Sequence, residues 1–327
     1  MTNDLYLITG ATGHLGTILV EELLARGERV RALVLAGEEG LVPEEAEIVT
    51  GDVTDAATLP AFFLRPADAR LILIHCAAVI TIATRRHGRL WDVNVQGTRN
   101  VMRQALLAGV ERVVHVSSVH AIPEQPQPER IAEPLHYRSH SVRGQYAKSK
   151  AAAAEIVRRF AERGLKASIV LPSGILGPGD RLHRNHMVRT VQAIVEGRLP
   201  AAVDGGYDFV DVRDLTAGIL SCVNQGRAGE SYIMNGTYIT VRALMDMVAE
   251  LTGCRAPRVD LPAGVAKVVA PAAELIAKLG GSAQPLLTPY SVYTLGTNAN
   301  FSHEKAAREL GYTVRDLRET VADTLER

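Results

Sequence analysis

The stretch Leu5-Tyr6-Leu7-Ile8-Thr9-Gly10-Ala11-Thr12-Gly13-His14-Leu15-Gly16 decides the fold of this 327-residue chain. Its apolar start predicts a buried strand, and residues 15–26 have helical period. Gly10 and Gly13 allow the backbone to bend and to approach a ligand closely, and Gly16 allows tight helix–strand packing. A helix that begins after such a turn directs unpaired amides at an anion. Because strand and helix flank the glycines, the stretch predicts a dinucleotide diphosphate site.

The charge balance and the cysteines limit the classes of partner. The chain has 36 Lys and Arg against 36 Asp and Glu, so no overall field attracts nucleic acid or an acidic membrane surface. Cys76, Cys222 and Cys254 have no paired spacing, which predicts no disulfide framework and no metal site. With a glycine run so near the first residue, this pattern indicates a cytoplasmic protein that binds a small molecule.

The most apolar long stretch, Ala263–Leu279, does not predict a membrane span. Pro271 interrupts it, and it also contains Lys267, Glu274 and Lys278. A span needs roughly 18 or more uninterrupted apolar residues. We therefore expect a pair of packed helices here.

Strand-like and helical patterns alternate through the first half of the chain. The strand-like runs lie at residues 5–8, 29–35, 47–49, 71–75, 112–116 and 167–171. The long helical segments lie at residues 15–26, about 86–108 and 142–163, and each is followed by or ends near a glycine, which favours a helix end. This alternation predicts an α/β fold with a Rossmann-type, doubly wound parallel sheet.

The regular alternation fades after Leu171, where residues 172–180 are rich in glycine and proline. We therefore predict a dinucleotide-binding domain at residues 1–172 and a smaller, mainly substrate-binding lobe at residues 173–327. Strand-like residues 207–212 suggest that segments near 207–235 complete the sheet. The proline-containing loop at 123–141 is long for a plain connection and is expected to form a wall or lid.

A tyrosine and a lysine lie four residues apart near the start of the predicted helix 142–163. Tyr146 and Lys150 therefore project from one helix face. Moving a phenol pKa from about 10 toward 7 takes about three units, and an adjacent ammonium supplies about 1 to 3. The charge of an oxidised nicotinamide would supply the remainder. Ser118 follows the strand 112–116, at the edge where parallel sheets bind ligands.

Together with these groups, several short motifs resemble the extended short-chain dehydrogenase/reductase superfamily over nearly the whole chain. The matching motifs are Gly10 to Gly16, Gly51-Asp52-Val53, His75-Cys76-Ala77-Ala78, Asn94-Val95-Gln96-Gly97-Thr98, Val116-Ser117-Ser118 and Tyr146 through Lys150. The sequence thus resembles the NAD-dependent epimerase/dehydratase family. Residues 288–291, 300–302 and 305–312 look most like the dihydroflavonol reductase and 3β-hydroxysteroid dehydrogenase branch.

The resemblance implies a role for each matching residue. Ser118 would hold the substrate oxygen, Tyr146 would exchange its proton, and Lys150 would bind the nicotinamide ribose and lower the tyrosine pKa. Asn94 would order the site from the helix beneath. The cofactor would be bound by Gly10, Thr12, Gly13, His14, Leu15, Gly16, Val34, Leu35, Asp52, Val53, Cys76, Ala77, Ala78, Val116, Tyr146, Lys150, Pro172, Ser173, Gly174 and Ile175. Val79, His120 and His186 are expected to contact the substrate, and no metal ligand is expected.

The implied reaction is hydride transfer between nicotinamide and a small ketone or secondary alcohol, with Tyr146 as acid and base. A nucleotide-sugar epimerase with tightly bound NAD is the alternative, and a non-catalytic dinucleotide sensor is a minor one. Sugar-nucleotide dehydratases carry an acidic pair where this chain has Val119-His120, which disfavours dehydration. Many epimerases have asparagine where this chain has Ser173.

The choice between NAD and NADP is expected at the end of the second strand, where an acidic residue would bond the ribose diol and an arginine would accept a 2′-phosphate. Val34 and Leu35 occupy those positions, and four glutamates follow within residues 38–45. These carboxylates would repel a phosphate, so the sequence favours NAD. The helices around residues 91–106 and 142–163 correspond to those through which the superfamily forms dimers, and we expect a homodimer.

Overall fold

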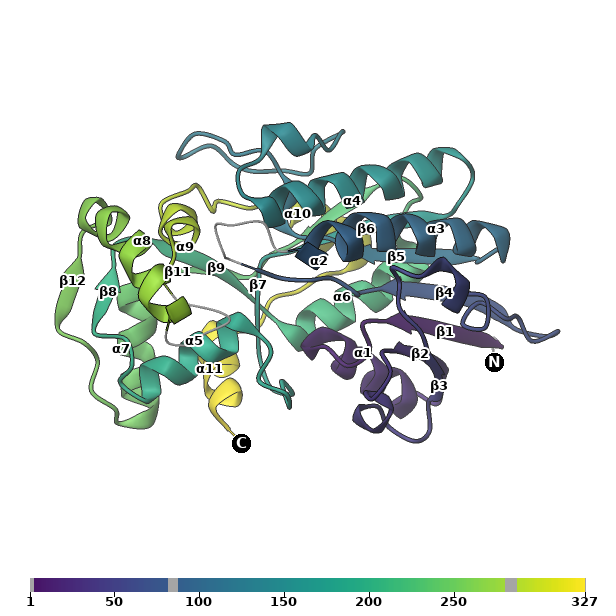
Figure 1. Cartoon of the computed structure of the whole chain (residues 1–327), viewed down its shortest axis with the longest axis horizontal. Helices are drawn as coiled ribbons and strands as arrows, with labels where there is room; N and C mark the ends of the chain where they lie inside the picture. The colour runs from purple at the N-terminus through teal and green to yellow at the C-terminus, as the bar shows by residue number, and fades with distance from the viewer. Residues whose placement is uncertain (1–2, 82–87, 280–286, 327) are drawn as a thin grey trace.

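The computed structural model describes residues 3–81, 88–279 and 287–326 (Figure 1). Its centre is a parallel sheet of seven described strands in the order β10-β6-β5-β4-β1-β2-β3. The strands are β1 Asp4–Thr9, β2 Arg29–Val34, β3 Glu47–Thr50, β4 Arg70–His75, β5 Arg112–Val116, β6 Ala167–Pro172 and β10 Ser231–Met234. The chain order reverses between β1 and β4, which is the switch point where doubly wound sheets bind ligands. The predicted α/β doubly wound fold is confirmed.

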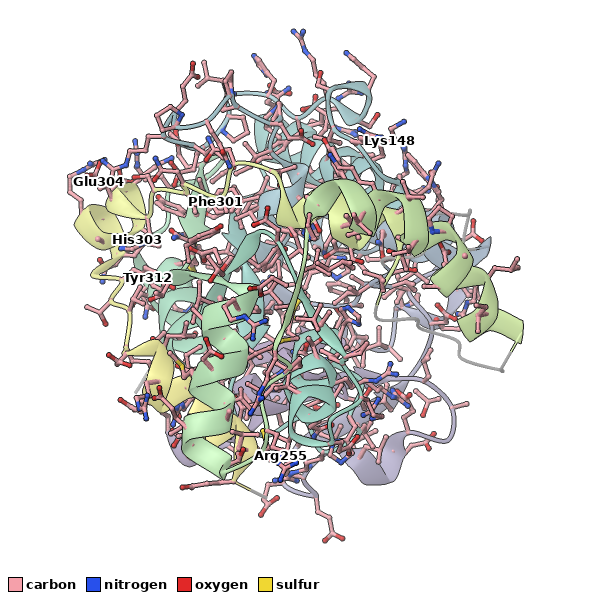
Figure 2. All side chains as sticks on the ribbon, turned by 90° about the vertical axis from the view of Figure 1, so that its left-hand side faces the viewer. Lys148, Arg255, Phe301, His303, Glu304 and Tyr312 are labelled. Atoms are coloured by element: carbon pink, nitrogen blue, oxygen red, sulfur yellow. The ribbon has the colours of Figure 1, made fainter. Side chains whose placement is uncertain are left out.

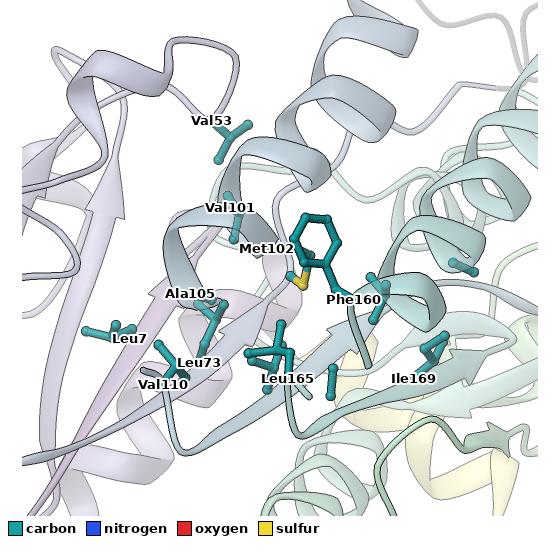
Figure 3. Packing of buried hydrophobic residues seen from close by; sticks show 14 of the residues in the cluster. Leu7, Val53, Leu73, Val101, Met102, Ala105, Val110, Phe160, Leu165 and Ile169 are labelled. Atoms are coloured by element: carbon teal, nitrogen blue, oxygen red, sulfur yellow. The ribbon is translucent and has the colours of Figure 1, made fainter. Parts of the chain in front are cut away.

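Helices cover both faces of this sheet, because its strands are apolar on both sides (Figure 1). One face is covered by α1 His14–Ala25, α6 Val212–Gln225 and α10 Glu304–Leu310. The other is covered by α3 Thr98–Leu107 and α4 Gln145–Glu162, which α2 Gly88–Trp91 and the π-helical turn Asp92–Gly97 precede. Figure 3 shows Val101 and Met102 of α3 and Phe160 of α4 packed above the strands. This buried layer fixes the start of α4 relative to the strand ends.

Short 3₁₀ turns connect several of these elements. They lie at Glu39–Leu41, Ala56–Thr58, Val119–Ala121 and Ser139–Ser141. Gly27, Gly109 and Gly164, which follow α1, α3 and α4, all have positive φ. The three predicted helix ends are therefore confirmed. Of the predicted helix at 86–108, residues 86 and 87 lie outside the described residues.

The C-terminal lobe has its own small sheets and helices at one end of the molecule (Figure 1). A sheet of β11 Thr237–Thr240, β9 Gly206–Asp211 and β7 Gly174–Leu176 lies beside a pair, β12 Val259–Leu261 and β8 Ala201–Val203. The helices of this lobe are α5 His186–Val195, α7 Val241–Thr252, α8 Ala263–Leu279, α9 Pro289–Leu295 and α11 Leu317–Leu325. Their buried aliphatic side chains form a separate core.

Two expectations about this lobe need correction. The strand at 207–212 does not join the central sheet, because β9 pairs with β7 and β11, and β10 alone from the 207–235 segment completes it. Residues 263–279 form one helix rather than two, with Pro271 inside it. An internal proline removes one hydrogen-bond donor and favours a kink, but it does not force the helix to end. No described helix is long and apolar enough to cross a bilayer. The boundary at residues 172/173 stays a prediction.

Candidate active site

The glycine stretch forms a tight crossing between β1 and α1. Gly10 has a φ of +70°, and a Cβ there would lie 2.7 Å from the backbone nitrogen of Ala77. A Cβ on Gly16 would lie 2.0 Å from the carbonyl oxygen of Gly10. Both contacts exclude a side chain. The backbone of the 76–78 segment after β4 therefore lies directly against the glycine turn, as expected for two parts of one cofactor cleft.

The start of α1 fits the diphosphate of a dinucleotide. Gly13 is its N-cap and supplies no side-chain hydrogen bond, and the first turn has no acidic residue. The first amides of α1 and the positive end of its dipole are thus free of a capping carboxylate. Thr9 Oγ1 bonds His75 Nδ1 at 2.7 Å and accepts from the Ala77 amide at 3.3 Å, which anchors the neighbouring segment. The residues present suit NAD or NADP, which supplies hydride chemistry when bound.

Ser118, Tyr146 and Lys150 converge at the carboxyl end of β5. Ser118 is 6% exposed and begins the turn Val119–Ala121, and its hydroxyl hydrogen-bonds Tyr146. Tyr146 is the second residue of α4. Lys150, one turn later, is 4% exposed and donates from Nζ to the Val116 carbonyl at 2.8 Å. Lys148, between them in the chain, lies near the rim of the molecule (Figure 2). The predicted face of α4 therefore points into the cleft.

The side-chain amide of Asn94 links Val79 to the start of α4 through hydrogen bonds. Its amide nitrogen donates to Ser149 Oγ at 2.9 Å, and Ser149 Oγ donates to the Tyr146 carbonyl at 2.7 Å. Its amide oxygen accepts from the Val79 amide at 2.7 Å. Asn94 lies in the π-helical turn that precedes α3 and is 1% exposed. Such a turn inserts an extra residue into a helix and is frequent at functional sites.

The pKa values of the tyrosine and the lysine differ from the sequence-based expectation. Burial raises the pKa of Tyr146 to about 12, although the Ser118 hydrogen bond lowers it in part. Burial also lowers the pKa of Lys150 to about 8. In the protein alone, burial of the phenol therefore outweighs any effect of the ammonium, and Tyr146 stays protonated at neutral pH. It is ready to donate a proton to a carbonyl oxygen.

Burial of Lys150 gives a testable pH dependence of stability. Between pH values of about 8 and 10.5, the unfolded chain holds the lysine proton more often than the folded chain. The free energy of unfolding therefore rises with pH in that window and stays level below it. From about pH 7.5 to about pH 9.5, wild type should gain about 2 kcal/mol relative to Lys150→Met in urea unfolding. Equal gains in both proteins would contradict the buried, pKa-lowered lysine.

A mostly apolar pocket, open to solvent, lies beside Ser118, Tyr146 and Lys150. Described residues that line it are Val119, His120, Ile122, Pro123, Glu124, Ile131, Val142, Arg143, Ala147, Tyr207, Tyr290, Tyr293, Thr294, Thr297, Asn298, Ala299 and Phe301. Residues 123, 124 and 131 belong to the loop 123–141, which confirms that this loop forms a wall. Phe301 reaches the cavity from the segment before α10, on the face shown in Figure 2.

The wall supplied by α9 is joined to the start of α4. The ring of Tyr290 lies where a side chain at Gly144 would be, since a Cβ there would lie 2.3 Å from Tyr290 Cε2. Gly144 is the N-cap of α4, with a φ of +94°. Arg143 lies over the Tyr293 ring at 4.2 Å, and Tyr293 donates a hydrogen bond to Glu124. The C-terminal lobe thus packs on the helix turn that presents Tyr146.

The adenosine end of the predicted site contains two acidic contacts. Asp52 accepts from Arg89 at 2.8 Å, and Val53 is buried beside Gly97. Beyond Val34 and the exposed Leu35, Glu38 accepts from Thr12 Oγ1 at 2.7 Å and from Arg184 at 2.9 Å. Partial burial raises the pKa of Glu38, but these two hydrogen bonds outweigh it and hold the pKa below its usual value.

His14 connects the glycine turn to the segment before α5. Its Nε2 donates to the Pro178 carbonyl at 2.8 Å, and its Nδ1 accepts from Asn185 Nδ2 at 2.7 Å. Burial lowers the pKa of His14, although the Pro178 hydrogen bond raises it in part. The neutral ring therefore supports both contacts. Leu15 is buried in the adjoining core. Cys76 and Ala78 follow β4, Pro172 is the last residue of β6, and Ser173 and Ile175 follow it.

The three residues expected at the substrate have different positions. His120 lines the cavity. Val79 bonds Asn94 through its backbone, and His186 begins α5; neither is among the lining residues. Sequence reasoning missed Tyr207, Tyr290 and Tyr293 as cavity residues. Their local sequence gives no signal for this, because the chain returns them to the site from β9 and α9.

Comparison with known proteins shows the family of this chain. The model of the NAD dependent epimerase/dehydratase family matches residues 6–235. A sterol demethylase protein B of Methylococcus capsulatus is 35% identical in sequence, and the match covers 98% of this chain and 96% of that protein. A 3 beta-hydroxysteroid dehydrogenase/Delta 5→4-isomerase of Mycobacterium tuberculosis is 28% identical, and the match covers 94% of this chain and 85% of that protein. The crystal structure of gox2253 matches with a TM-score of 0.84 and 32% sequence identity, and the match covers 99% of this chain and 97% of that one. The chain therefore belongs to the NAD dependent epimerase/dehydratase family, and it is an NAD(P)-dependent enzyme of the extended short-chain dehydrogenase/reductase superfamily.

Proposed function

We propose that the protein is a dehydrogenase or reductase that transfers a hydride between NAD and a secondary alcohol or ketone on an apolar ring skeleton. The observation that carries this proposal is the convergence of Ser118, Tyr146 and Lys150 beside the cavity. Ser118 and Tyr146 hydrogen-bond the substrate oxygen, and Tyr146 gives up or accepts its proton. Lys150 holds positive charge near the phenol, which favours phenolate as the proton leaves.

The walls of the cavity support an apolar substrate. Val119, Ile122, Ile131 and Val142 supply aliphatic surface, and three tyrosines supply flat aromatic surface. Two relatives have names that refer to sterols or hydroxysteroids, which are flat apolar ring systems bearing an oxygen. A cyclic secondary alcohol of this type would bury its skeleton against these walls and place its oxygen at Tyr146.

The same walls favour this activity over nucleotide-sugar epimerisation. Arg143 is the only cationic side chain among the described residues that line the cavity, and it lies over the Tyr293 ring. A sugar diphosphate carries two negative charges and is normally bound by cations or helix amides. An epimerase would keep its NAD bound and show no net redox turnover, so isolation in that state would favour this alternative.

For the cofactor, we propose that Glu38 makes the enzyme prefer NAD. The carboxylate lies just beyond β2 and beside the glycine turn, where it can accept from the ribose diol and repel a 2′-phosphate. We expect NADH to bind at least about tenfold more tightly than NADPH, or about 1.4 kcal/mol. Glu38→Gln should reduce this ratio, whereas Glu44→Gln, at an exposed site, should not. Titration by nicotinamide fluorescence measures both affinities, and tighter NADPH binding by the wild type would overturn the preference.

The activity is tested by supplying NAD with a panel of 3β-hydroxysteroids and cyclohexanols, and NADH with the matching ketones, and by following nicotinamide absorbance. The proposed function predicts turnover that depends on the ring alcohol or ketone and that is lost in Lys150→Met. Absence of turnover in both directions, in protein that binds NADH, would contradict it. That result would leave the epimerase or the sensor alternative.

A further inference from the structure

His120 and Tyr207 form a polar pair at the inner end of the cavity. His120 Nε2 lies 2.5 Å from the Tyr207 hydroxyl oxygen. The two side chains come from different parts of the fold, one from the turn after β5 and the other from β9. The Tyr207 ring covers Gly174, where a Cβ would lie 2.7 Å from its Cε1. The pair therefore lies between the segment after β6 and the substrate cavity.

The hydrogen-bond partners determine which ring nitrogen of His120 carries the proton. The Tyr207 hydroxyl has no other hydrogen-bond partner among the described residues, so its proton is satisfied only by donation to Nε2. An imidazole that accepts at Nε2 carries its hydrogen on Nδ1. Nδ1 has no partner in the described part of the chain. His120 thus presents an unpaired N–H donor.

No described side chain accepts a hydrogen bond from Nδ1 of His120, so a bound ligand can supply the acceptor. Beside His120 the cavity is lined by Val119, Ile122 and Ala147. Its acceptors, such as Glu124 and Asn298, make no hydrogen bond with Nδ1. His120 is partly buried, and its Nδ1 is not among the fully enclosed unpartnered atoms of the described residues, so an acceptor bound in the cavity can reach it. The His120 and Tyr146 rings lie 5.9 Å apart between centroids, and the His120 backbone amide donates to Ser118 Oγ at 3.2 Å. An acceptor bound at Nδ1 is therefore close to the reacting oxygen.

We propose that the substrate carries a second, uncharged oxygen on a carbon adjacent to the reacting one or one carbon further on, and that this oxygen accepts a hydrogen bond from Nδ1 of His120. Tyr207 acts as a positioning residue that fixes the ring and its proton. The inference rests on the proposed function, because it places the second oxygen relative to a carbonyl or hydroxyl held by Tyr146. It adds a substrate class, which is a ring ketone or alcohol with a neighbouring ether, hydroxyl or carbonyl oxygen.

The electrostatics favour an uncharged oxygen over a carboxylate. Burial lowers the pKa of His120 to about 4, so the ring is neutral at physiological pH and offers no positive charge. The same low pKa makes it a weak base, so hydrogen bonding suits it better than removal of a proton from carbon. Burial keeps the pKa of Tyr207 well above its usual value, and Tyr207 therefore remains a donor.

The test uses two ring ketones of nearly equal shape. The 2-methoxycyclohexanone molecule has an acceptor oxygen next to the carbonyl carbon, and 2-ethylcyclohexanone has a methylene in its place. With NADH and the full-length enzyme, we expect kcat/KM for the methoxy ketone to be about tenfold higher, mainly through KM. His120→Leu should abolish this ratio. His120→Asn should restore most of it, because the asparagine amide supplies a donor near the place of Nδ1. His136→Leu, an exposed histidine outside the cavity, should leave the ratio unchanged.

Each outcome separates this inference from the proposed function. If wild type reduces both ketones equally well, or if His120→Leu retains the preference, the second-oxygen site is wrong and the hydride-transfer function stands. A preference that His120→Asn does not restore would also overturn the donor assignment. If wild type reduces neither ketone and no other ring ketone or alcohol, both the proposed function and this inference fail. Tyr207→Phe should reduce the preference without abolishing turnover.

Discussion

Tyr146→Phe is expected to lower kcat by a factor of about 10²–10⁴ while leaving the dissociation constant of NADH nearly unchanged. The hydroxyl is the only group removed, and in the proposed reaction it is the group that moves a proton to or from the substrate oxygen. The ring remains, so the packing of α4 against the cleft is retained. In the empty site the phenol is protonated, because burial raises its pKa to about 12. The rate with saturating NADH and a ring ketone, together with NADH titration, measures both effects.

The matched control for this experiment is Tyr238→Phe, which removes a phenolic hydroxyl from an exposed residue of β11. It should retain the wild-type rate. A Tyr146→Phe enzyme that kept more than half of the wild-type kcat would refute the assignment of Tyr146 as acid and base. Loss of NADH affinity in parallel with the rate would instead indicate a disturbed cleft.

Gly16→Ala is expected to abolish dinucleotide binding at concentrations that saturate the wild type, a loss of about 10²-fold or more. The new Cβ would lie 2.0 Å from the Gly10 carbonyl oxygen and 2.9 Å from the Ala11 Cα. These are backbone atoms of the turn itself, so the contact is relieved only by moving α1 away from β1. We expect unfolding free energy to fall by about 1–3 kcal/mol as well. Isothermal titration with NADH and urea unfolding measure the two effects.

Gly40→Ala is the control, since no heavy atom lies within 4 Å of a Cβ at that position and its φ is not positive. Its NADH affinity and stability should match the wild type. If Gly16→Ala bound NADH within twofold of the wild type, the close packing of the glycine turn would not be what shapes the diphosphate site.

The strands of the central sheet were predictable because the apolar pattern of each one lies within a few consecutive residues. Apolar runs such as 71–75 and 112–116 indicate buried strands of a parallel sheet. The glycines that follow the helices indicate the helix ends. The convergence of Ser118, Tyr146 and Lys150 was predictable for a related reason. Tyr146 and Lys150 share one helix, so their spacing alone places them together, and Ser118 follows directly from a strand end.

The substrate lobe was not predictable in the same way. The residues at 207–212 read as a strand, but nothing in them indicates which sheet that strand joins. The single helix at 263–279 depends on α9 packed against one side of it, which no local pattern reports. Tyr207 and Tyr290 become site residues only through the return of distant segments. The homodimer and the cytoplasmic location stay predictions.

The contact between Tyr290 and Gly144 makes the two halves of the chain interdependent. The turn at Gly144, which presents Tyr146, packs against the ring of Tyr290. That ring belongs to α9, nearly 150 residues further along the chain. A fragment ending near residue 172 would lack the Tyr290 ring behind Gly144, and it would also lack β10 and α6 of the central layers. The lobe that lines the substrate cavity therefore also supports the turn that presents Tyr146.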